Sequence, residues 1–486
     1  MSSPDSLVTT RAALAAHRFG LGEARLATVG ADATGWLLQQ LGPAEAQRGS
    51  GLASGAEGVK RFAQFLDEQR RKPPPARSAD AAMDTRPAEQ QFGEHFRAIV
   101  QADIRARLST AALSTQPFNE RLALFWANHF TVSMAKASAR GVVGAFEREA
   151  IRPHINGSFE GLLKAVVHHA GMLRYLDNDS SAGPDSPLVR RQARRPRAEG
   201  QQPPRITGLN ENLAREILEL HTLGVSNGGG AYGGWGGYTQ ADVTEFARVL
   251  TGWRVALRDV VEQGNAKDPV RFDAAWHQPG PKTVLGRAYP EGPEALDLVL
   301  RDLAQHPSTA RFVSTKLARH FVADEPPPAL VARLEASFRK SGGDLAELHR
   351  TLVLSPEAWA PQPAKLKTPE EFVISTVRVL QLGEQAFARQ ADASISQLGQ
   401  RVQAAPSPAG WPDRAEEWLG PDAVWKRVEW ATRVAERVGR NLDARAIARA
   451  SLGPLLQEDT LRQIERAADG PQALALLLMS PEFQRR

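Results

Sequence analysis

The sequence predicts an all-α protein, a multi-helix bundle around one large core with at most a small β-hairpin near residues 270–286. Most of the 486 residues repeat one pattern: a Ser, Thr, Asp or Asn cap, a stretch of helical periodicity, and then Gly or Pro. Long alternating runs of β-branched residues are scarce. The hydrophobic fraction of 42% beside 24% charged residues is ordinary for a globular chain and disfavours wholesale disorder.

The helical pattern extends along the whole chain, so we expect one helical domain over residues 1–486, with a candidate C-terminal helical subdomain at 365–486. Three stretches are typical of mobile inserts: 70–87 is Pro-rich, 180–208 is rich in Arg and Pro, and 224–238 is Gly-rich. The strand candidate is 283–286, with 270–272 as its expected hairpin partner.

Composition excludes several classes of site. The chain has no cysteine, which excludes disulfides, thiolate zinc sites and a Cys nucleophile. No apolar run approaches the roughly 20 residues of a membrane span, and the N-terminus makes a poor signal peptide. We therefore expect a cytoplasmic location, with export by another route left open. The net charge of +5 argues only weakly for nucleic acid, which we expect not to be a partner.

A carboxylate interrupts the apolar seam of the segment 209–224. Spacings of three and four residues place Glu216 on the same helix face as four leucines. A charge on a buried face is costly unless it is paired or neutral, so Glu216 is predicted to have a partner. The same segment supplies further candidate binding residues: Asn210 as the expected N-cap, Asn212 beside Glu216, the charge ladder Glu211, Arg215 and Glu219, and His221 near the C-terminal end.

A second helix, expected over residues 119–132, shows the same anomaly. Its apolar seam of Leu122, Phe125 and Trp126 continues into His129. Because each helix places one titratable group in an apolar seam, we expect the seams to face each other, with Glu216 and His129 close together, directly or through an ion or water. A buried pair that only satisfies itself would give the same pattern.

Oxygen-bearing residues follow another predicted helix end, at Asp177 and Asn178. Together with Glu216 and His129, Asp177 forms the candidate catalytic set and the candidate ligand set for a divalent metal ion. The loop 277–282 adds His277 and Lys282 as expected contacts at the rim of a pocket. No metalloprotease, serine-hydrolase, kinase or dinucleotide motif is present, so no signature fixes a reaction.

Several segments resemble a bacterial family of unknown function, number eighteen hundred in its series. They are His17–Gly20, Phe125–Phe130, Tyr175–Asn178, Gly208–Gly224, Gly237–Val243, Leu250–Trp253, Lys316–Phe321 and the Ser-Pro-Glu-Phe run near the C-terminus. The resemblance implies a mostly helical protein that is often encoded beside a sulfatase-like companion, a candidate partner. It implies no reaction, cofactor or catalytic residue.

Three functions fit these observations. The first is a metal-assisted hydrolase of a polar or anionic substrate, with a pocket at Glu216 and His129. The alternative is a non-catalytic scaffold or adaptor that works with a partner protein. The third is binding of an anionic polymer through the Arg-rich insert at 180–208, although such runs are more often solvated.

Overall fold

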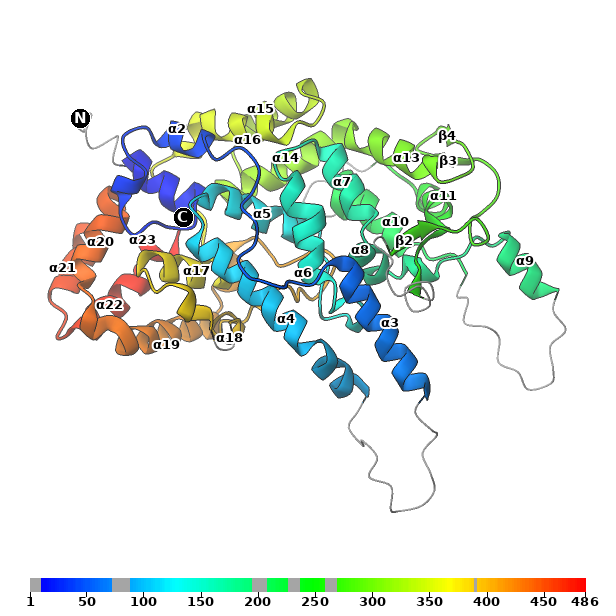
Figure 1. The fold of residues 1–486 in the computed structure, drawn as a ribbon. Helices are drawn as coiled ribbons and strands as arrows, with labels where there is room; N and C mark the ends of the chain where they lie inside the picture. Colours follow the sequence, from blue (N-terminus) through cyan, green and yellow to red (C-terminus); the bar gives the residue numbers. More distant parts are fainter. Residues whose placement is uncertain (1–9, 72–87, 195–207, 226–236, 258–268, 389–390) are drawn as a thin grey trace, which may run out of the picture.

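The computed structural model describes residues 10–71, 88–194, 208–225, 237–257, 269–388 and 391–486. Helices dominate these residues, as predicted, and the strands form two small two-stranded sheets. The molecule is elongated, with the C-terminal helices α19–α22 at one end and the strands at the other (Figure 1). Among the described helices, none combines the length and apolar character that a membrane crossing requires.

The first half of the chain is built from short helices and two long ones, α3 and α4, which pack beside each other. Its elements are η1 (Ala15–Phe19), η2 (Leu26–Thr28), α2 (Ala33–Leu38), α3 (Gly55–Arg71), α4 (Ala88–Leu113), α5 (Pro117–His129), η3 (Ala137–Ala139), α6 (Val143–Phe146), η4 (Glu147–Ile151), η5 (Arg152–His154), α7 (Phe159–Val167), α8 (Ala170–Tyr175), η6 (Asn178–Ser180), α9 (Pro187–Ala193), α10 (Asn212–Glu216) and η7 (Ile217–Thr222).

The second half begins with α11 and the strands, and all of its later elements are helices. Its helices are α11 (Gln240–Leu250), α13 (Glu294–Ala304), α14 (Pro307–Phe321), α15 (Pro328–Lys340), α16 (Leu345–Leu354), η8 (Pro356–Trp359), α17 (Pro369–Val379), η9 (Glu384–Phe387), α18 (Ala393–Gln397), η10 (Ala415–Trp418), α19 (Pro421–Val438), η11 (Gly439–Asn441), α20 (Ala444–Leu452), η12 (Gly453–Leu455), α21 (Glu458–Glu465), α22 (Gly470–Met479) and α23 (Pro481–Gln484).

Two capping boxes fix helix starts that matter for the site. The box of Thr239 and Asp242 begins α11. A second box begins α17: the Thr368 hydroxyl accepts a hydrogen bond from the backbone of Glu371, whose carboxylate accepts one from the backbone of Thr368. Each box satisfies two otherwise unpaired backbone donors. The second box also fixes the position of the buried Glu371 side chain.

Two of the four strands in the described residues lie at or beside the predicted places, 270–272 and 283–286, but these two do not pair with each other. The strand β2 (Val270–Phe272) pairs with β1 (Trp253–Val255) instead of the strand near 283. The strand β3 (Lys282–Val284) turns directly into β4 (Arg287–Tyr289). Leu285 and Gly286 both have positive φ, 52° and 74°, which is the conformation of a two-residue type I′ hairpin turn. Leucine is unusual there, so the turn has no clear sequence signal.

The predicted inserts are partly helical. Residues 70 and 71 belong to α3, and the stretch 180–208 contains α9, whose N-cap Ser186 accepts a hydrogen bond from the backbone of Val189. These described residues are helical, and the mobility of the inserts stays a prediction. Residues 72–87, 195–207 and 226–236 of the three inserts lie outside the described residues.

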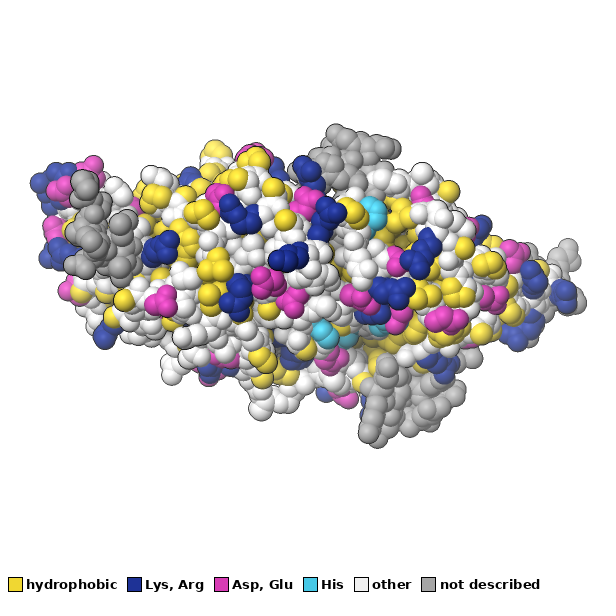
Figure 2. Space-filling model, turned by 90° about the horizontal axis from the view of Figure 1, so that it is seen from above, with side chains coloured by type: hydrophobic (Ala, Val, Ile, Leu, Met, Phe, Trp, Pro, Cys, Tyr) yellow, Lys and Arg dark blue, Asp and Glu magenta, His cyan; other side chains and the backbone are white. Residues whose placement is uncertain are grey.

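One large hydrophobic core extends from Ala12 to Phe483, and a smaller cluster joins α3 to α4. The segment 365–367 pairs with 484–486 through backbone hydrogen bonds that include the bridge of Leu366 with Arg485. The two ends of the C-terminal stretch are thereby held together beside α14. The face in Figure 2 has basic and acidic side chains interspersed, with no broad area of one sign.

Candidate active site

The helix that carries Glu216 buries a face one residue away from the predicted one. Its buried residues are Leu213, Ala214, Ile217, Leu218, His221 and Thr222, whereas Glu216 is half-buried. Buried positions recur every four residues because α10 passes into the wider π-helical turn η7. An ideal helical period of 3.6 residues places Glu216 among the leucines, but the real helix turns it to the edge.

Glu216 nevertheless has an unusual environment. Burial, followed by the charge of Glu219, raises the pKa of Glu216 to about 7, although Arg215 opposes the shift. Tyr175 is a neighbour, since the charge of Glu216 contributes, after burial, to raising the pKa of Tyr175 to about 12. Within the described residues, no hydrogen bond or ion pair involves the Glu216 carboxylate. The half-buried acid therefore stays protonated to unusually high pH because no cation is paired with it.

His129 does meet this helix, but through His221. Its Nε2 lies 3.1 Å from the His221 carbonyl oxygen, and the two imidazole rings are 6.4 Å apart. Burial, Lys316 and His221 hold the pKa of His129 well below its usual range. Because a carbonyl only accepts, Nε2 carries the proton and Nδ1 carries a lone pair. The two helices are thus in contact at His129 and His221, while in the described part of the chain no hydrogen bond or ion pair links Glu216 to His129.

The residues around Asp177 have structural partners. Asp177 adopts a left-handed conformation with φ of 57° and pairs with Lys136. The Asn178 amide donates to the carbonyls of Leu250 and Trp253 at 3.1 and 3.0 Å. The Asn210 amide donates to the Asp177 carbonyl at 3.3 Å. These bonds tie the end of α8 to α10 and α11.

The predicted charge ladder joins α10 to α11. Glu211 accepts hydrogen bonds from Arg215, Gln240 and Thr244. The observed N-cap is Glu211, but Asn210 performs part of the predicted capping, since its Oδ1 accepts from the backbone of Asn212 at 2.9 Å. Asn212 itself is exposed.

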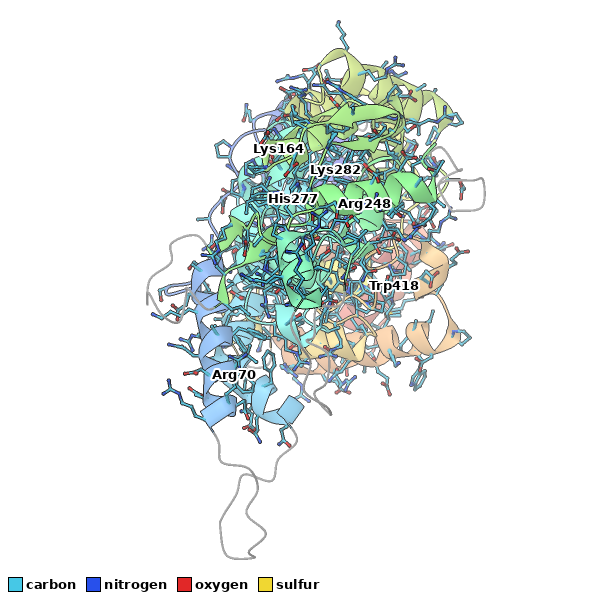
Figure 3. The ribbon with its side chains drawn as sticks, turned by 90° about the vertical axis from the view of Figure 1, so that its right-hand side faces the viewer. Arg70, Lys164, Arg248, His277, Lys282 and Trp418 are labelled. Atoms are coloured by element: carbon cyan, nitrogen blue, oxygen red, sulfur yellow. The ribbon has the colours of Figure 1, made fainter. Side chains whose placement is uncertain are left out.

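His277 and Lys282 are buried instead of lying at a rim. His277 Nδ1 is 2.7 Å from the Thr251 carbonyl, so Nδ1 donates and Nε2 accepts from Lys282 Nζ at 2.8 Å. Lys282 also donates to the Gln278 carbonyl. Burial lowers the pKa of Lys282 to about 8. Figure 3 shows His277 and Lys282 near Arg248, at the end of the molecule that carries the small sheets.

The candidate metal ligands are not gathered into one centre. Over the described ranges of the chain, no group of three or more His, Asp or Glu side chains is arranged to hold a metal ion. Glu216, His129 and Asp177 instead have the separate surroundings given above.

A cavity of about 400 Å³ lies elsewhere, where α5, α14, α17 and the segment 400–413 meet. His129 is the one predicted site residue on its wall. The wall also holds charged and titratable side chains that sequence reasoning missed: Arg107, Glu147, Lys316, His320, Glu371 and Asp413.

The central feature of the cavity is the pair of His320 and Asp413. His320 Nδ1 lies 2.9 Å from Asp413 Oδ2, and Lys365 Nζ lies 3.2 Å from the other carboxylate oxygen. Burial raises the pKa of Asp413, but His320 and Lys365 outweigh it and hold that pKa far below the usual range. Burial lowers the pKa of His320 despite Asp413, so the imidazole is neutral near pH 7. It donates from Nδ1 and presents a lone pair at Nε2.

Nothing in the described residues hydrogen-bonds to His320 Nε2, although this atom is buried. The Oε1 atom of Glu371 lies 4.0 Å from this nitrogen. Burial favours a protonated Glu371, but Arg486 and Arg121 outweigh it and lower the pKa of Glu371 to about 2. The lone pair of Nε2 is therefore free to accept a proton, and a fixed negative charge close by favours the imidazolium that forms.

The loop that supplies Asp413 is fastened to α5. The Asn128 amide donates to the Trp411 carbonyl at 2.9 Å, and the Trp411 backbone donates back to Asn128 Oδ1 at 2.8 Å. Gly410 has φ of 84°, and a Cβ there would lie 2.5 Å from the Asn128 carbonyl oxygen. A side chain at residue 410 would therefore disturb the clasp that positions Asp413.

The protein is therefore mainly helical, and its buried pair of His320 and Asp413 lies on the wall of a small cavity. A family model described as "Protein of unknown function (DUF1800)" matches residues 14–485. The chain belongs to this family. Comparisons with curated proteins and with solved structures return no match.

Proposed function

We propose that the protein is a hydrolase of a small polar or anionic substrate, with His320 as general base and Asp413 as its orienting carboxylate. The observation that carries the proposal is the unpartnered Nε2 of a neutral, Asp-anchored histidine on the wall of a cavity. Small-molecule sites usually measure about 300–1,000 Å³, so the cavity has a suitable size. A side chain positioned as a general base contributes about 10²–10⁴-fold to proton-transfer chemistry.

The proposed steps use only side chains on the wall. A water molecule gives a proton to His320 Nε2 as its oxygen attacks the electrophilic centre of the substrate. Asp413 stabilises the imidazolium, which then gives the proton to the leaving group. Lys316, one helical turn before His320 on α14, stabilises the negative charge that develops on the substrate.

The metal-assisted form of this hydrolysis has less support. Glu216, His129 and Asp177 would have to converge, and their described surroundings are separate. We assign His129 to substrate binding in the cavity, where its ring is part of the wall. Glu216 and Asp177 are outside the proposed chemistry.

The test is turnover of a panel of model esters, amides and phosphate esters by the parent and by His320→Gln. We expect the substitution to reduce kcat by about 10²–10⁴-fold. The matched control is His168→Gln, because His168 also pairs with an aspartate, Asp297, at 2.8 Å but does not line the cavity. Both variants are checked for a native circular dichroism spectrum.

Full turnover by His320→Gln would overturn the proposal. A folded parent that hydrolyses no member of the panel would also count against it, and would favour the scaffold function. In that case binding to the sulfatase-like companion that the family resemblance suggests is the next measurement. Binding of polyanions by the Arg-rich segment is tested separately, by measuring how retention of the protein on polyanions depends on salt concentration.

A further inference from the structure

Exposed apolar side chains gather at one place near the C-terminal end of the molecule. In the described part of the chain, five large hydrophobic side chains are exposed, and four of them lie within residues 419–428. They are Trp425, which is 62% exposed, and Leu419, Val424 and Val428, which are 37–42% exposed. Single exposed hydrophobic residues are ordinary on soluble proteins, but a contiguous group of them marks an interaction site.

Three of these residues belong to α19, whose other face is packed against the molecule. Helix α19 contacts α22, and its buried residues are Arg427, Trp430, Ala431 and Ala435. At 3.6 residues per turn, Trp425 lies opposite the centre of this buried face. Figure 1 shows α19 along the lower edge of the C-terminal helices, so its outer side points away from the rest of the molecule.

A strip of four charged residues follows one flank of this outer side. The charged strip consists of Asp422, Lys426, Glu429 and Arg433. Spacings of three and four residues place them on one side of the helix, beside Trp425. Within the strip, the first and second residues pair at 2.5 Å, and the third and fourth pair at 3.9 Å. The two valines of the apolar group lie on the other flank of Trp425.

The order of charges along the strip is self-complementary. When two copies of α19 run antiparallel, one register places Asp422 of each copy opposite Arg433 of the other. The same register places Lys426 opposite Glu429, because both pairs are centred on one point, between residues 427 and 428. A twofold axis through this point brings the two charged strips to one side of the contact and the valines to the other. A parallel pair would set like charges beside each other.

We propose that α19 is a homodimer interface, in which two copies of the chain pack their α19 helices antiparallel through Trp425 and its neighbouring valines. The helix has 18 residues, so it is about 27 Å long. One helix face is smaller than the roughly 800 Å² per partner of a standard interface, so we expect a weak dimer with a Kd on the order of 10 µM. The described lining of the cavity includes no residue of α19, so this inference goes beyond the proposed hydrolase function and is independent of it.

The experiment is sedimentation analysis of the full chain at concentrations from about 1 µM to about 1 mM, a range that spans the expected Kd. We expect the parent to pass from monomer to dimer within this range. Trp425→Glu should stay monomeric throughout, because a dimer would bury two unpaired carboxylates at its centre. The matched control is Leu354→Glu: Leu354 is 58% exposed, but it lies at the end of α16, away from α19. It should dimerise as the parent does.

Charge reversal tests the antiparallel register. Asp422→Lys alone sets two positive charges opposite each other in both symmetry-related pairs, and Arg433→Glu alone sets two negative charges there. Each variant should dimerise roughly tenfold more weakly than the parent. An equimolar mixture of the two variants should recover the affinity of the parent, because both pairs of the mixed dimer then have opposite charges.

Three results would overturn the proposed interface. A parent that stays monomeric over the whole range would exclude the homodimer, and the apolar group would then be a surface for a different protein. Dimerisation that survives Trp425→Glu would place the contact elsewhere on the chain. A mixture of the two charge variants that is as weak as each variant alone would exclude the antiparallel register. All substituted side chains are solvent-exposed, so each variant should keep the circular dichroism spectrum of the parent.

Discussion

The cavity and the edge around Glu216 both take titratable groups out of water, but they stabilise them in different ways. In the cavity, each carboxylate has a cation within ion-pair distance. Glu216 is paired with no cation in the described structure, and its pKa rises to about 7. A paired network keeps charges available for chemistry near pH 7, whereas an isolated half-buried acid tends towards its neutral form.

The two regions should differ most in how much stability the protein loses when the cation of an ion pair is removed. Arg107→Met should destabilise the protein by about 3–5 kcal/mol, because it leaves the buried Glu370 without its cation and removes the closer of the two cations of Glu147, whose other partner is Arg152 at 4.0 Å. Arg215→Met removes the half-exposed partner of Glu211 and should cost less than about 1 kcal/mol. Urea unfolding of the two variants measures the difference. Equal costs would contradict the contrast.

A smaller loss of stability is expected from a substitution in the loop that holds Asp413. Gly410→Ala should cost about 1–3 kcal/mol, since Gly410 has a left-handed conformation and its Cβ would press on Asn128. Turnover should fall as well, because Asp413 shifts relative to His320. Gly420→Ala is the control: open space surrounds Gly420, and its φ is −58°. An activity loss shared by both variants would argue against the clasp.

The smallest effect is a change in pH dependence at Glu216. A raised folded-state pKa means that the folded protein binds more protons than the unfolded chain between about pH 4.5 and 7. The contribution of Glu216 to stability therefore falls as pH rises through this window, and its cost is complete above about pH 7. Glu216→Gln should raise the melting temperature at pH 8 and leave it nearly unchanged at pH 4. A lower melting temperature at pH 8 would show that Glu216 has a stabilising partner.

Local periodicity was enough to predict the helical fold and the burial of His129 on the apolar face of its helix. These features depend on residues close together in sequence. The prediction that Glu216 lies on the buried face was wrong because a π-helical turn changes the helical period. The residue types in this segment give no signal for that turn. The strand pairing failed because Leu285 lacks the sequence signature of a tight turn.

The sequence did not predict the cavity, for a different reason. His320 and Asp413 are 93 residues apart, and Asp413 follows a Pro-rich stretch that is typical of a connection between helices. His320 and Asp413 come together only because α14 packs against the segment that contains Asp413. The one usable signal was the family resemblance of the run Lys316–Phe321, which carries both Lys316 and His320.

The most direct measurement is the nitrogen NMR spectrum of the His320 ring, assigned by comparison with His320→Gln. The structure leads us to expect a neutral imidazole at pH 7, protonated at Nδ1, with an Nε2 that carries no proton. An imidazolium at pH 7, or a proton on Nε2, would contradict the assignment of His320 as the base.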